Sequence, residues 1–432
     1  MRKFIYKVTQ NAGLLFSGNL SAAAIGAAAI AINARALGPK EFAILALLQT
    51  FILVCDRFFS FDTWQPFVAS ISSDKKQLTV GVFTSAIRSS LKFDLISSII
   101  GGLFGLFVVA YFSELLQLTK ELVPFALVYV STLFLRISGA PIGILRFEGK
   151  FKWQALLQVY ESLLRLAISI HLSVQQANLS SYLIFFACIA VLRQISQWVI
   201  AVTAWRRSEI LPCTLNWQDA SASVSSEFKK FSISTWVHSS SNVIRQNADI
   251  FVLSAFGFGG AVGYYAIAQR ASGLLARAAD AARYSIFPEI TKLSGKYSEE
   301  QAKLILIKSI PYISIVLIMP FLVALIFSKQ LILLILGAEY LPVREPLLLL
   351  VVAQSIYLAG FAIGPLVQTI VSPTAILGMT IPAFSISMIV MLCIIPFFGL
   401  NGAGISQIIF NAIWFSIGIV LILRNLKRSA FT

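Results

Sequence analysis

Long apolar runs alternate with short polar connections along the 432 residues of the chain. The runs are about 20 residues long, the length that an α-helix needs to cross a hydrocarbon core of about 30 Å. The pattern therefore predicts an all-α integral membrane protein. Its twelve predicted transmembrane helices are 13–34, 42–61, 91–112, 122–145, 154–174, 181–204, 233–255, 261–287, 305–327, 346–370, 374–398 and 402–424.

The polar connections alternate in charge. Those on one side of the predicted bilayer, both chain ends included, hold 18 lysines and arginines. Those on the other side hold five, namely Arg35, Lys40, Lys120, Lys329 and Arg344. Basic residues gather in cytoplasmic loops. Both termini and the longest polar stretch, 205–232, are therefore expected in the cytoplasm.

That stretch divides the chain into two halves of six helices. It predicts an N-terminal bundle at 1–204, a cytoplasmic linker at 205–232 and a C-terminal bundle at 233–432. The halves repeat weakly: Gly139-Ala-Pro-Ile-Gly143 resembles Gly360-Phe-Ala-Ile-Gly364, and Leu37-Gly38 resembles Phe256-Gly257, at offsets of 221 and 219 residues. Both halves start on the same side, so the repeat is parallel. Chance similarity between apolar segments is the alternative.

Composition excludes a water-soluble body. Hydrophobic residues make up 58% and charged residues 12% of the chain, and the mean hydropathy is +0.83. Soluble proteins carry about 25% charged residues. The net charge of +15 is explained by cytoplasmic loops, so no nucleic-acid partner is expected. The sequence shows no CxxC pair, metal-ligand cluster, nucleotide-binding loop or catalytic triad, so we expect no metal, no cofactor and no enzyme.

Eight arginines fall inside the predicted spans: Arg57, Arg136, Arg165, Arg193, Arg245, Arg270, Arg277 and Arg283. An arginine at a helix centre costs about 2.5–3.5 kcal/mol, so eight facing lipid would cost on the order of 20 kcal/mol. Arg57 and Arg283 fall near a membrane interface. The other six are expected to face a protein interior or a wet cavity.

Helical periodicity places several of these arginines on narrow polar stripes. The stripes contain Gln154, Gln158, Glu161, Arg165 and Ser169; His238, Ser241, Asn242, Arg245 and Asp249; Arg270, Arg277 and Asp280; and Gln49, Asp56 and Ser60. Such stripes on apolar helices are typical of a water-filled space. For Glu161/Arg165 and Arg245/Asp249, an i,i+4 ion pair that locks helices together is the alternative.

Arginines outnumber acids inside the spans, which predicts a cationic cavity suited to an anion. The planar guanidinium fork suits a phosphate. The candidate substrate-binding residues are Arg136, Arg165, Arg193, Arg245, Arg270 and Arg277. The candidates for ion coupling are Asp56, Glu161, Asp249 and Asp280, because neighbouring charges control the protonation of a partly desolvated carboxylate. Permanent ion pairing of these four acids is the alternative.

Short motifs occur in a fixed order over most of the chain: Arg35–Phe42, Arg146–Phe151, Asn247–Leu253, Ala261–Arg270, Phe287-Pro288-Glu289, Gly337–Tyr340 and Gly399–Gly404. With them the chain resembles the oligosaccharide-lipid flippases, the Wzx-type translocases of O-antigen and other polysaccharides. These belong to the multidrug/oligosaccharidyl-lipid/polysaccharide (MOP) exporter superfamily. One departure is Ser60–Phe67, where members often carry an Asp-Leu-Gly-like sequence.

The resemblance implies two six-helix bundles around a central cavity. It also implies that an undecaprenyl-pyrophosphate-linked oligosaccharide moves from the inner to the outer leaflet of the inner membrane by alternating access. The partners implied are this lipid-linked substrate, the lipid bilayer, and the polysaccharide polymerase and chain-length machinery.

Two alternatives remain open at this point. A multidrug exporter of the same superfamily would be expected to have an acidic cavity. A membrane glycosyl polymerase or ligase would be expected to have a sizeable outer loop, and the longest outer connection, 328–345, is short.

Overall fold

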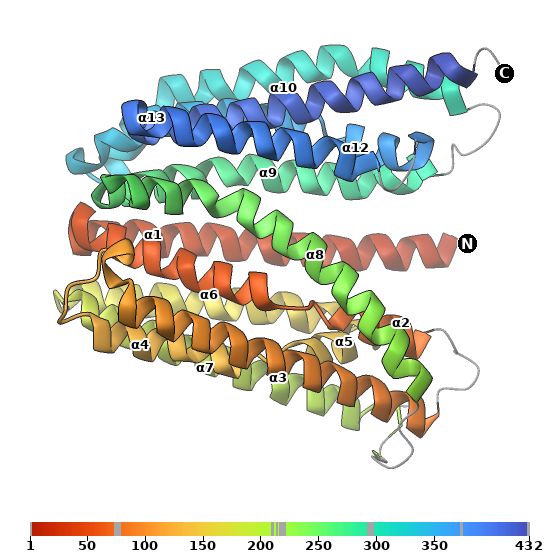
Figure 1. Cartoon of the computed structure of the whole chain (residues 1–432), viewed down its shortest axis with the longest axis horizontal. Coiled ribbons are helices and arrows are strands. Elements are labelled where there is room, and N and C mark those ends of the chain that lie inside the picture. Colours follow the sequence, from red (N-terminus) through yellow and green to blue (C-terminus); the bar gives the residue numbers. More distant parts are fainter. Residues whose placement is uncertain are drawn as a thin grey trace. The chain divides into compact units, whose positions relative to one another are not determined.

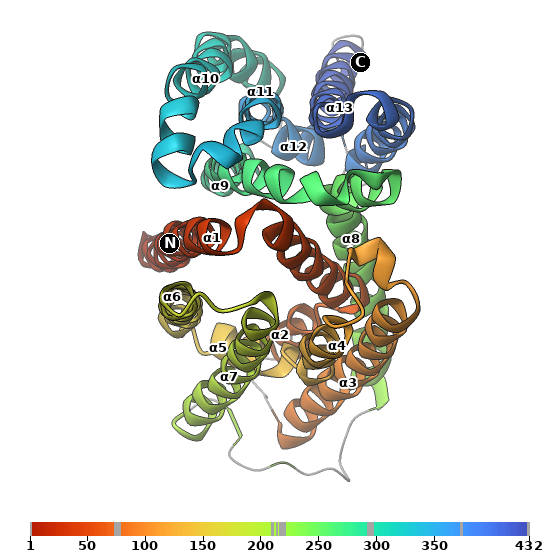
Figure 2. The same ribbon diagram turned by 90° about the vertical axis from the view of Figure 1, so that its left-hand side faces the viewer.

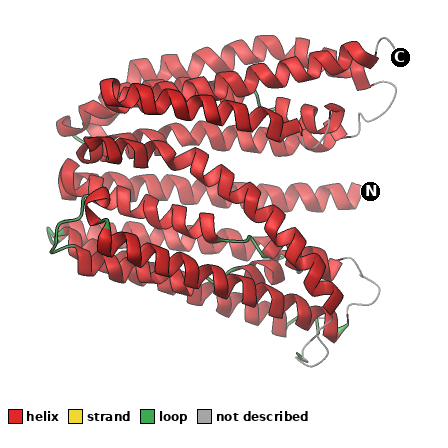
Figure 3. Cartoon of the chain, viewed as in Figure 1, coloured by secondary structure: helices red, strands yellow, loops and turns green. Residues whose placement is uncertain are grey.

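The computed structural model describes the backbone of residues 2–72, 79–208, 211–212, 215, 222–291, 298–371 and 375–429. Every regular element in these ranges is a helix (Figure 3). Lipid offers no hydrogen-bond partners, so a helix, which satisfies its own backbone, is the element expected there. The chain forms two compact units, one of residues 1–37 and 44–248 and the other of residues 38–43 and 249–432.

The first unit is built mainly from the N-terminal half of the chain. Its elements are α1 (Arg2–Phe59, apart from residues 38–43), α2 (Trp64–Ser72), α3 (Val80–Tyr111), η1 (Ser113–Leu116), α4 (Val123–Ser131), η2 (Thr132–Leu135), α5 (Gly139–Phe147), α6 (Phe151–Val174), α7 (Leu179–Arg206) and α8 (Ala222–Leu253) up to Ala248. Helix α4 contacts both α3 and α7, and α7 also contacts α5 and α6 (Figures 1 and 2). A buried cluster that includes Phe67, Phe83, Ile144 and Phe228 joins α2, α3, α5 and α8.

The second unit contains the end of α8 and the rest of the chain. Its further elements are η3 (Ser254–Phe258), η4 (Gly259–Ala261), α9 (Val262–Thr291), α10 (Ser298–Ile335), η5 (Ala338–Val343), α11 (Arg344–Ala359), α12 (Ile363–Leu366), η6 (Val367–Val371) and α13 (Ala375–Ser429). Helix α11 contacts α9, α10 and α13 (Figure 2). A buried cluster around Ile363, Leu366 and Met379 packs α12 against α13.

Eight helices among the described residues are long and apolar enough to cross a membrane, or up to nine if one bent pair counts as a span. Three of these segments each overlap two of the spans predicted from the sequence: Ser17–Ile71, Val243–Arg277 and Ala375–Asn425. A helix of 51 or 55 residues is about 80 Å long at 1.5 Å per residue, much more than one crossing needs. The twelve-span count itself stays a prediction.

Each of these long segments is interrupted by a glycine with positive φ. The φ angles are 69° at Gly38, 84° at Gly257 and 51° at Gly399. Residues with a Cβ rarely adopt this conformation, so glycine is the residue expected at such a turn. Gly38 and Gly257 are two of the positions matched by the predicted repeat.

The fourth predicted span, 122–145, is not one continuous helix. It is divided into α4 with η2 and, after residues 136–138, α5, and the two parts are bent by 48°. The tenth predicted span, 346–370, is interrupted at residues 360–362, between α11 and α12. The first break, 136–138, directly precedes the sequence that begins at Gly139, whereas the second, 360–362, begins at the matched Gly360. Both halves are therefore interrupted near the matched sequences, but not at equivalent residues.

Close packing at the first break generates a stability prediction. A Cβ at Gly139 would lie 1.7 Å from Thr63 Oγ1, 2.8 Å from Ser90 Oγ and 2.9 Å from Asp94 Oδ2. We expect Gly139→Ala to lower the free energy of unfolding by about 1–3 kcal/mol, the usual cost of overpacking a core. The measurement is thermal unfolding of the purified protein in detergent.

The matched control is Gly26→Ala in α1, where an added Cβ would meet nothing within 4 Å. Alanine inside a helix is favoured over glycine by about 0.5–1 kcal/mol, so this variant should be unchanged or slightly more stable. Equal melting temperatures for the two variants would contradict the packing described at Gly139.

Candidate functional site

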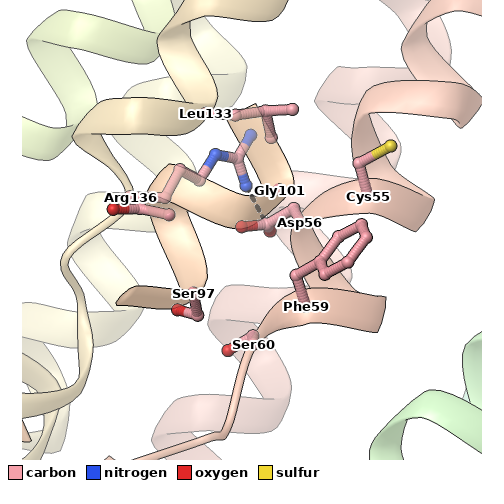
Figure 4. A pocket seen from close by; sticks show the side chains of 9 residues that line it. Cys55, Asp56, Phe59, Ser60, Ser97, Gly101, Leu133 and Arg136 are labelled. Carbon is pink, nitrogen blue, oxygen red and sulfur yellow. Dashed lines mark hydrogen bonds and ion pairs between the residues drawn. The ribbon is translucent and has the colours of Figure 1, made fainter. Parts of the chain in front are cut away.

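A small, open pocket lies in the first unit beside the break in the fourth span. Its lining residues are Cys55, Asp56, Phe59, Ser60, Ser97, Ser98, Gly101, Leu133 and Arg136 (Figure 4). Arg136 Nη1 donates to Asp56 Oδ2 across the pocket, so an ion pair joins α1 to the residue that follows η2. The two side chains are 24% and 18% exposed, which leaves the pair partly accessible.

The end of α1 that lines this pocket is held by α8. Trp236 Nε1 donates to the Phe58 carbonyl oxygen at 2.7 Å, and Ser240 Oγ donates to the same oxygen at 2.9 Å. Thr235 Oγ1 donates to the Phe61 carbonyl at 3.0 Å. The last carbonyls of a helix have no partner within it. The side chains of α8 bond to one carbonyl at the end of α1 and to another just after it, and so fix the turn that carries Ser60.

A second group of charges joins α6 to α7. Glu161 Oε1 accepts from Arg165 Nη2 at 2.9 Å and from Arg165 Nε at 3.2 Å. Its other oxygen, Oε2, lies 2.9 Å from Arg193 Nε. One carboxylate therefore holds two arginines. Arg165 also lies 5.5 Å from the centre of the Phe186 ring, which adds a cation–π contact.

The two groups form one electrostatic cluster, which we call the arginine cluster: Asp56, Arg136, Glu161, Arg165 and Arg193. Arg136 lies close enough to Glu161 and Arg193 for their charges to interact, and Asp56 acts on Arg193 in the same way. Three guanidinium groups face two carboxylates, so the formal charge of the cluster is +1. The exposed fraction is 18–29% for the side chains of Asp56, Arg136, Glu161 and Arg165, and 37% for that of Arg193.

Arg193 and Arg165 differ in how many of their guanidinium nitrogens contact Glu161. Within the described part of the chain, the contact of Arg193 with Glu161 uses Nε, and its two terminal nitrogens hold no hydrogen bond. Arg165 uses both Nε and Nη2 on the same carboxylate oxygen. The terminal nitrogens of Arg193 are therefore not used on Glu161, whereas Arg165 uses two of its three nitrogens on that carboxylate.

The sequence predicted five of these residues separately, and the structure brings them together. The Glu161/Arg165 ion pair at i,i+4, which the sequence analysis gave as the alternative to a wet cavity, is present. The predicted stripes gave no sign of two further contacts, those of Arg193 with Glu161 and of Arg136 with Asp56. Both join residues on different helices, and the periodicity of one helix does not report on them.

In the second unit the predicted residue Asp249 is fully buried, at 1% exposed, and is held by neutral donors. Its Oδ2 accepts from Tyr265 Oη at 2.6 Å, from Gln407 Nε2 at 3.1 Å and from Gln269 Nε2 at 3.5 Å. Tyr265 and Gln407 were not among the predicted site residues. A tyrosine and a glutamine within apolar helical sequence are the signal that could have pointed to them.

The remaining predicted residues lie on α8 and α9. Arg245 and Arg270 are partly buried, and Arg277 is exposed. Asp280 lies on α9, and its side chain is outside the part of the chain that the structure describes. Their assignment to a substrate site stays a prediction.

The sequence analysis also missed Asp94, which is 5% exposed on α3. Its Oδ1 accepts from Thr63 Oγ1 at 2.6 Å, and its Oδ2 accepts from the Gly139 amide at 2.7 Å. A signal was present, because Asp94 lies in a helix with Ser89, Ser90, Ser97 and Ser98, all of them buried. A buried acid surrounded by hydroxyl groups indicates a polar network inside the helix bundle.

Comparison with known proteins covers both sequence and fold. The sequence matches the family model described as "Polysaccharide biosynthesis protein" over residues 8–294. It is also 24% identical over 163 residues to the inner membrane protein YghQ of Escherichia coli (strain K12). That match covers 38% of this chain and 46% of YghQ, so the chain spans less than half the length of this curated relative.

The fold is similar to two solved transporter structures. One is an inward-facing MATE family multidrug resistance transporter of the MOP superfamily, with a TM-score of 0.66, 17% identity and coverage of 94% of each chain. The other is the lipid II flippase MurJ in an inward closed conformation, with a TM-score of 0.66, 18% identity and coverage of 96% of this chain and 87% of MurJ. At these identities the likeness shows the MOP-type fold.

These findings agree with the apolar helices that the structure describes. The chain is a multi-pass inner-membrane protein. The family model covers more than half of its length. The chain belongs to the polysaccharide biosynthesis protein family.

Proposed function

We propose that the protein is a flippase that moves an undecaprenyl-pyrophosphate-linked oligosaccharide, such as an O-antigen repeat unit, from the inner to the outer leaflet by alternating access. The observation that carries the proposal is the arginine cluster, with three arginines on two acids inside membrane helices. The polysaccharide biosynthesis family and the fold shared with a lipid II flippase support it. It is a transport function without catalysis.

The cluster suits a pyrophosphate for two reasons. Its surplus positive charge offsets part of the charge of the headgroup where water is scarce. The planar fork of arginine also donates paired hydrogen bonds to phosphate oxygens, which a lysine cannot do. Arg193 has two terminal nitrogens for this role, and Arg136 faces the pocket. Arg245, Arg270 and Arg277 are proposed as further substrate contacts from the second half.

Transport outward is favoured by the membrane potential. Moving about two negative charges out of a negative-inside cell across 100 mV releases about 4–5 kcal/mol, less if a cation moves with them. We propose Asp249 as the residue most suited to couple flipping to the movement of a proton. Its tyrosine and glutamine donors can serve either protonation state, whereas Asp56 and Glu161 are each paired with arginine. Asp280 remains a further candidate.

The topology follows from the charge count. We propose twelve spans in two six-helix bundles around a cationic cavity, at 1–204 and 233–432, with both termini and the linker 205–232 in the cytoplasm. Polysaccharide polymerase and chain-length machinery are the proposed partners on the pathway.

The second candidate function is multidrug export, which the fold shared with a MATE transporter favours. Such a protein carries cationic drugs and is expected to have an excess of acids at its binding site. In the arginine cluster the arginines outnumber the acids, so we favour an anionic substrate.

The first functional prediction separates Arg193 from Arg165. We expect Arg193→Ala to reduce flipping about tenfold or more, the effect of losing charge-assisted hydrogen bonds, without a large change in melting temperature. Arg165→Ala should mainly lower the melting temperature, because Glu161 loses the arginine that donates two hydrogen bonds to it. Flipping is measured in proteoliposomes with an undecaprenyl-pyrophosphate-linked sugar and full-length protein.

The matched control is Arg206→Ala at the end of α7, since this arginine is exposed and lies on the same helix as Arg193. It should flip at the wild-type rate. Arg193→Lys should restore only part of the activity, because lysine keeps the charge and loses the fork. Wild-type flipping by Arg193→Ala at equal abundance would show that the cluster is structural.

The second functional prediction concerns coupling. Asparagine at Asp249 can accept the hydrogen bond of Tyr265 but cannot take up a proton. We expect Asp249→Asn to fold and to lose the dependence of flipping on an imposed pH gradient. Flipping by Asp56→Asn should keep that dependence, because the Asp56 carboxylate is paired with Arg136. A pH dependence unchanged in Asp249→Asn would exclude this residue as the proton carrier.

A further inference from the structure

The break in the fourth span has an unusual turn at its centre. Arg136 has φ −78° and ψ 62°, and the Ile137 amide donates to the Leu135 carbonyl oxygen at 2.8 Å. This is an inverse γ-turn. The chain therefore leaves helical geometry at the residue that carries the pocket guanidinium, and it resumes a helix at Gly139.

A break at membrane depth exposes backbone groups that lipid cannot satisfy. Here α7 supplies the missing donors from one face. Gln194 Nε2 donates to the Ile137 carbonyl at 2.7 Å, and Trp198 Nε1 donates to the same oxygen at 2.9 Å. The Ser138 hydroxyl donates to Gln194 Oε1 at 3.2 Å. Positions 194 and 198 are one turn apart, so both side chains reach the same stretch of backbone.

The other side of the break is held by Asp94 of α3. Its carboxylate accepts from the first amide of α5, at Gly139, and from Thr63, whose hydroxyl lies 3.0 Å from Ser90 Oγ. A carboxylate at a helix N-terminus is stabilised by the helix dipole as well as by the hydrogen bond. The lack of a side chain at Gly139 is what allows this close approach.

The interruption at residues 360–362 in the second unit is packed differently. Gly360 lies against the Phe415 ring and Gly364 against Trp414, and the Ile363 amide donates to the Gly360 carbonyl at 3.0 Å. Its three residues, Gly360, Phe361 and Ala362, carry no charge. Among the described residues, the polar bracing thus accompanies the break that carries Arg136.

We propose that Asp94 is a positioning residue for the substrate anion: with Gln194 and Trp198 it fixes the break at residues 136–138 so that Arg136 is presented to the pocket beside Asp56. This rests on the proposed function, in which Arg136 binds pyrophosphate. Asp94 itself does not touch the anion. It acts through the α5 N-terminus. Because Arg136 is already ordered in the folded protein, binding of the anion does not have to supply the free energy of ordering it.

The test measures binding of inorganic pyrophosphate to the full-length protein in nanodiscs by calorimetry. Arg136→Ala should weaken binding about tenfold, which is about 1.4 kcal/mol. Asp94→Leu should weaken it to the same extent, and the double variant should bind no more weakly than either single one, because both changes remove the same contact. Asp94→Asn should bind within about threefold of wild type, since one amide can accept from Gly139 and donate to Thr63.

Two further variants keep the test decisive. Glu114→Gln removes an exposed carboxylate from η1, twenty residues after Asp94 along the chain, and should leave binding unchanged. If Asp94→Leu does not fold, Gln194→Met replaces it, because this change removes one donor to Ile137 and leaves Trp198 in place. It should weaken binding less than Arg136→Ala and add nothing to that variant.

The outcomes separate the two proposals. Unchanged pyrophosphate binding by Arg136→Ala would overturn this part of the proposed function. Weakened binding by Arg136→Ala together with full binding by folded Asp94→Leu would overturn the positioning role alone. Additive losses in the double variant would also overturn it, because Asp94 would then act independently of Arg136.

Discussion

Backbone hydrogen bonding inside the membrane is the constraint on which the rest of the first unit depends. A chain in lipid stays helical unless other groups bond to the amides and carbonyls that a break releases. At residues 136–138 the side chains of Asp94, Gln194 and Trp198 supply those bonds. The chain can therefore leave the helix at Arg136, which places a guanidinium beside Asp56 of α1.

The charges of the arginine cluster are paired, but not all of them are neutralised. A charge that leaves water needs a partner, and removing one partner leaves the other uncompensated. Glu161 meets this need for two arginines, and Asp56 meets it for Arg136. One positive charge remains, on partly exposed side chains. In the proposed function, this surplus charge receives the substrate anion.

The two units share their pattern of interruptions and differ in what surrounds them. Positive-φ glycines at 38 and 257 recur at an offset of 219 residues, and each half has an interrupted span, at 136–138 and at 360–362. Among the described residues, acid, amide and hydroxyl groups surround the first interruption, and aromatic rings lie against the glycines of the second. Similar interruptions are thus packed with different side chains in the two halves.

The sequence by itself determined that the chain is helical and apolar enough to cross a membrane several times, because apolar length and helical period are properties of one segment at a time. It also offered the Glu161/Arg165 pair as an alternative, since this pair is local to one helix. Only the tertiary structure decided that Arg193 shares Glu161, that Arg136 meets Asp56 eighty residues away, and that Asp94 and Asp249 are held by Thr63, Gly139, Tyr265 and Gln407. Periodicity fixes which residues share a face, but the packing of one helix on another decides what that face meets.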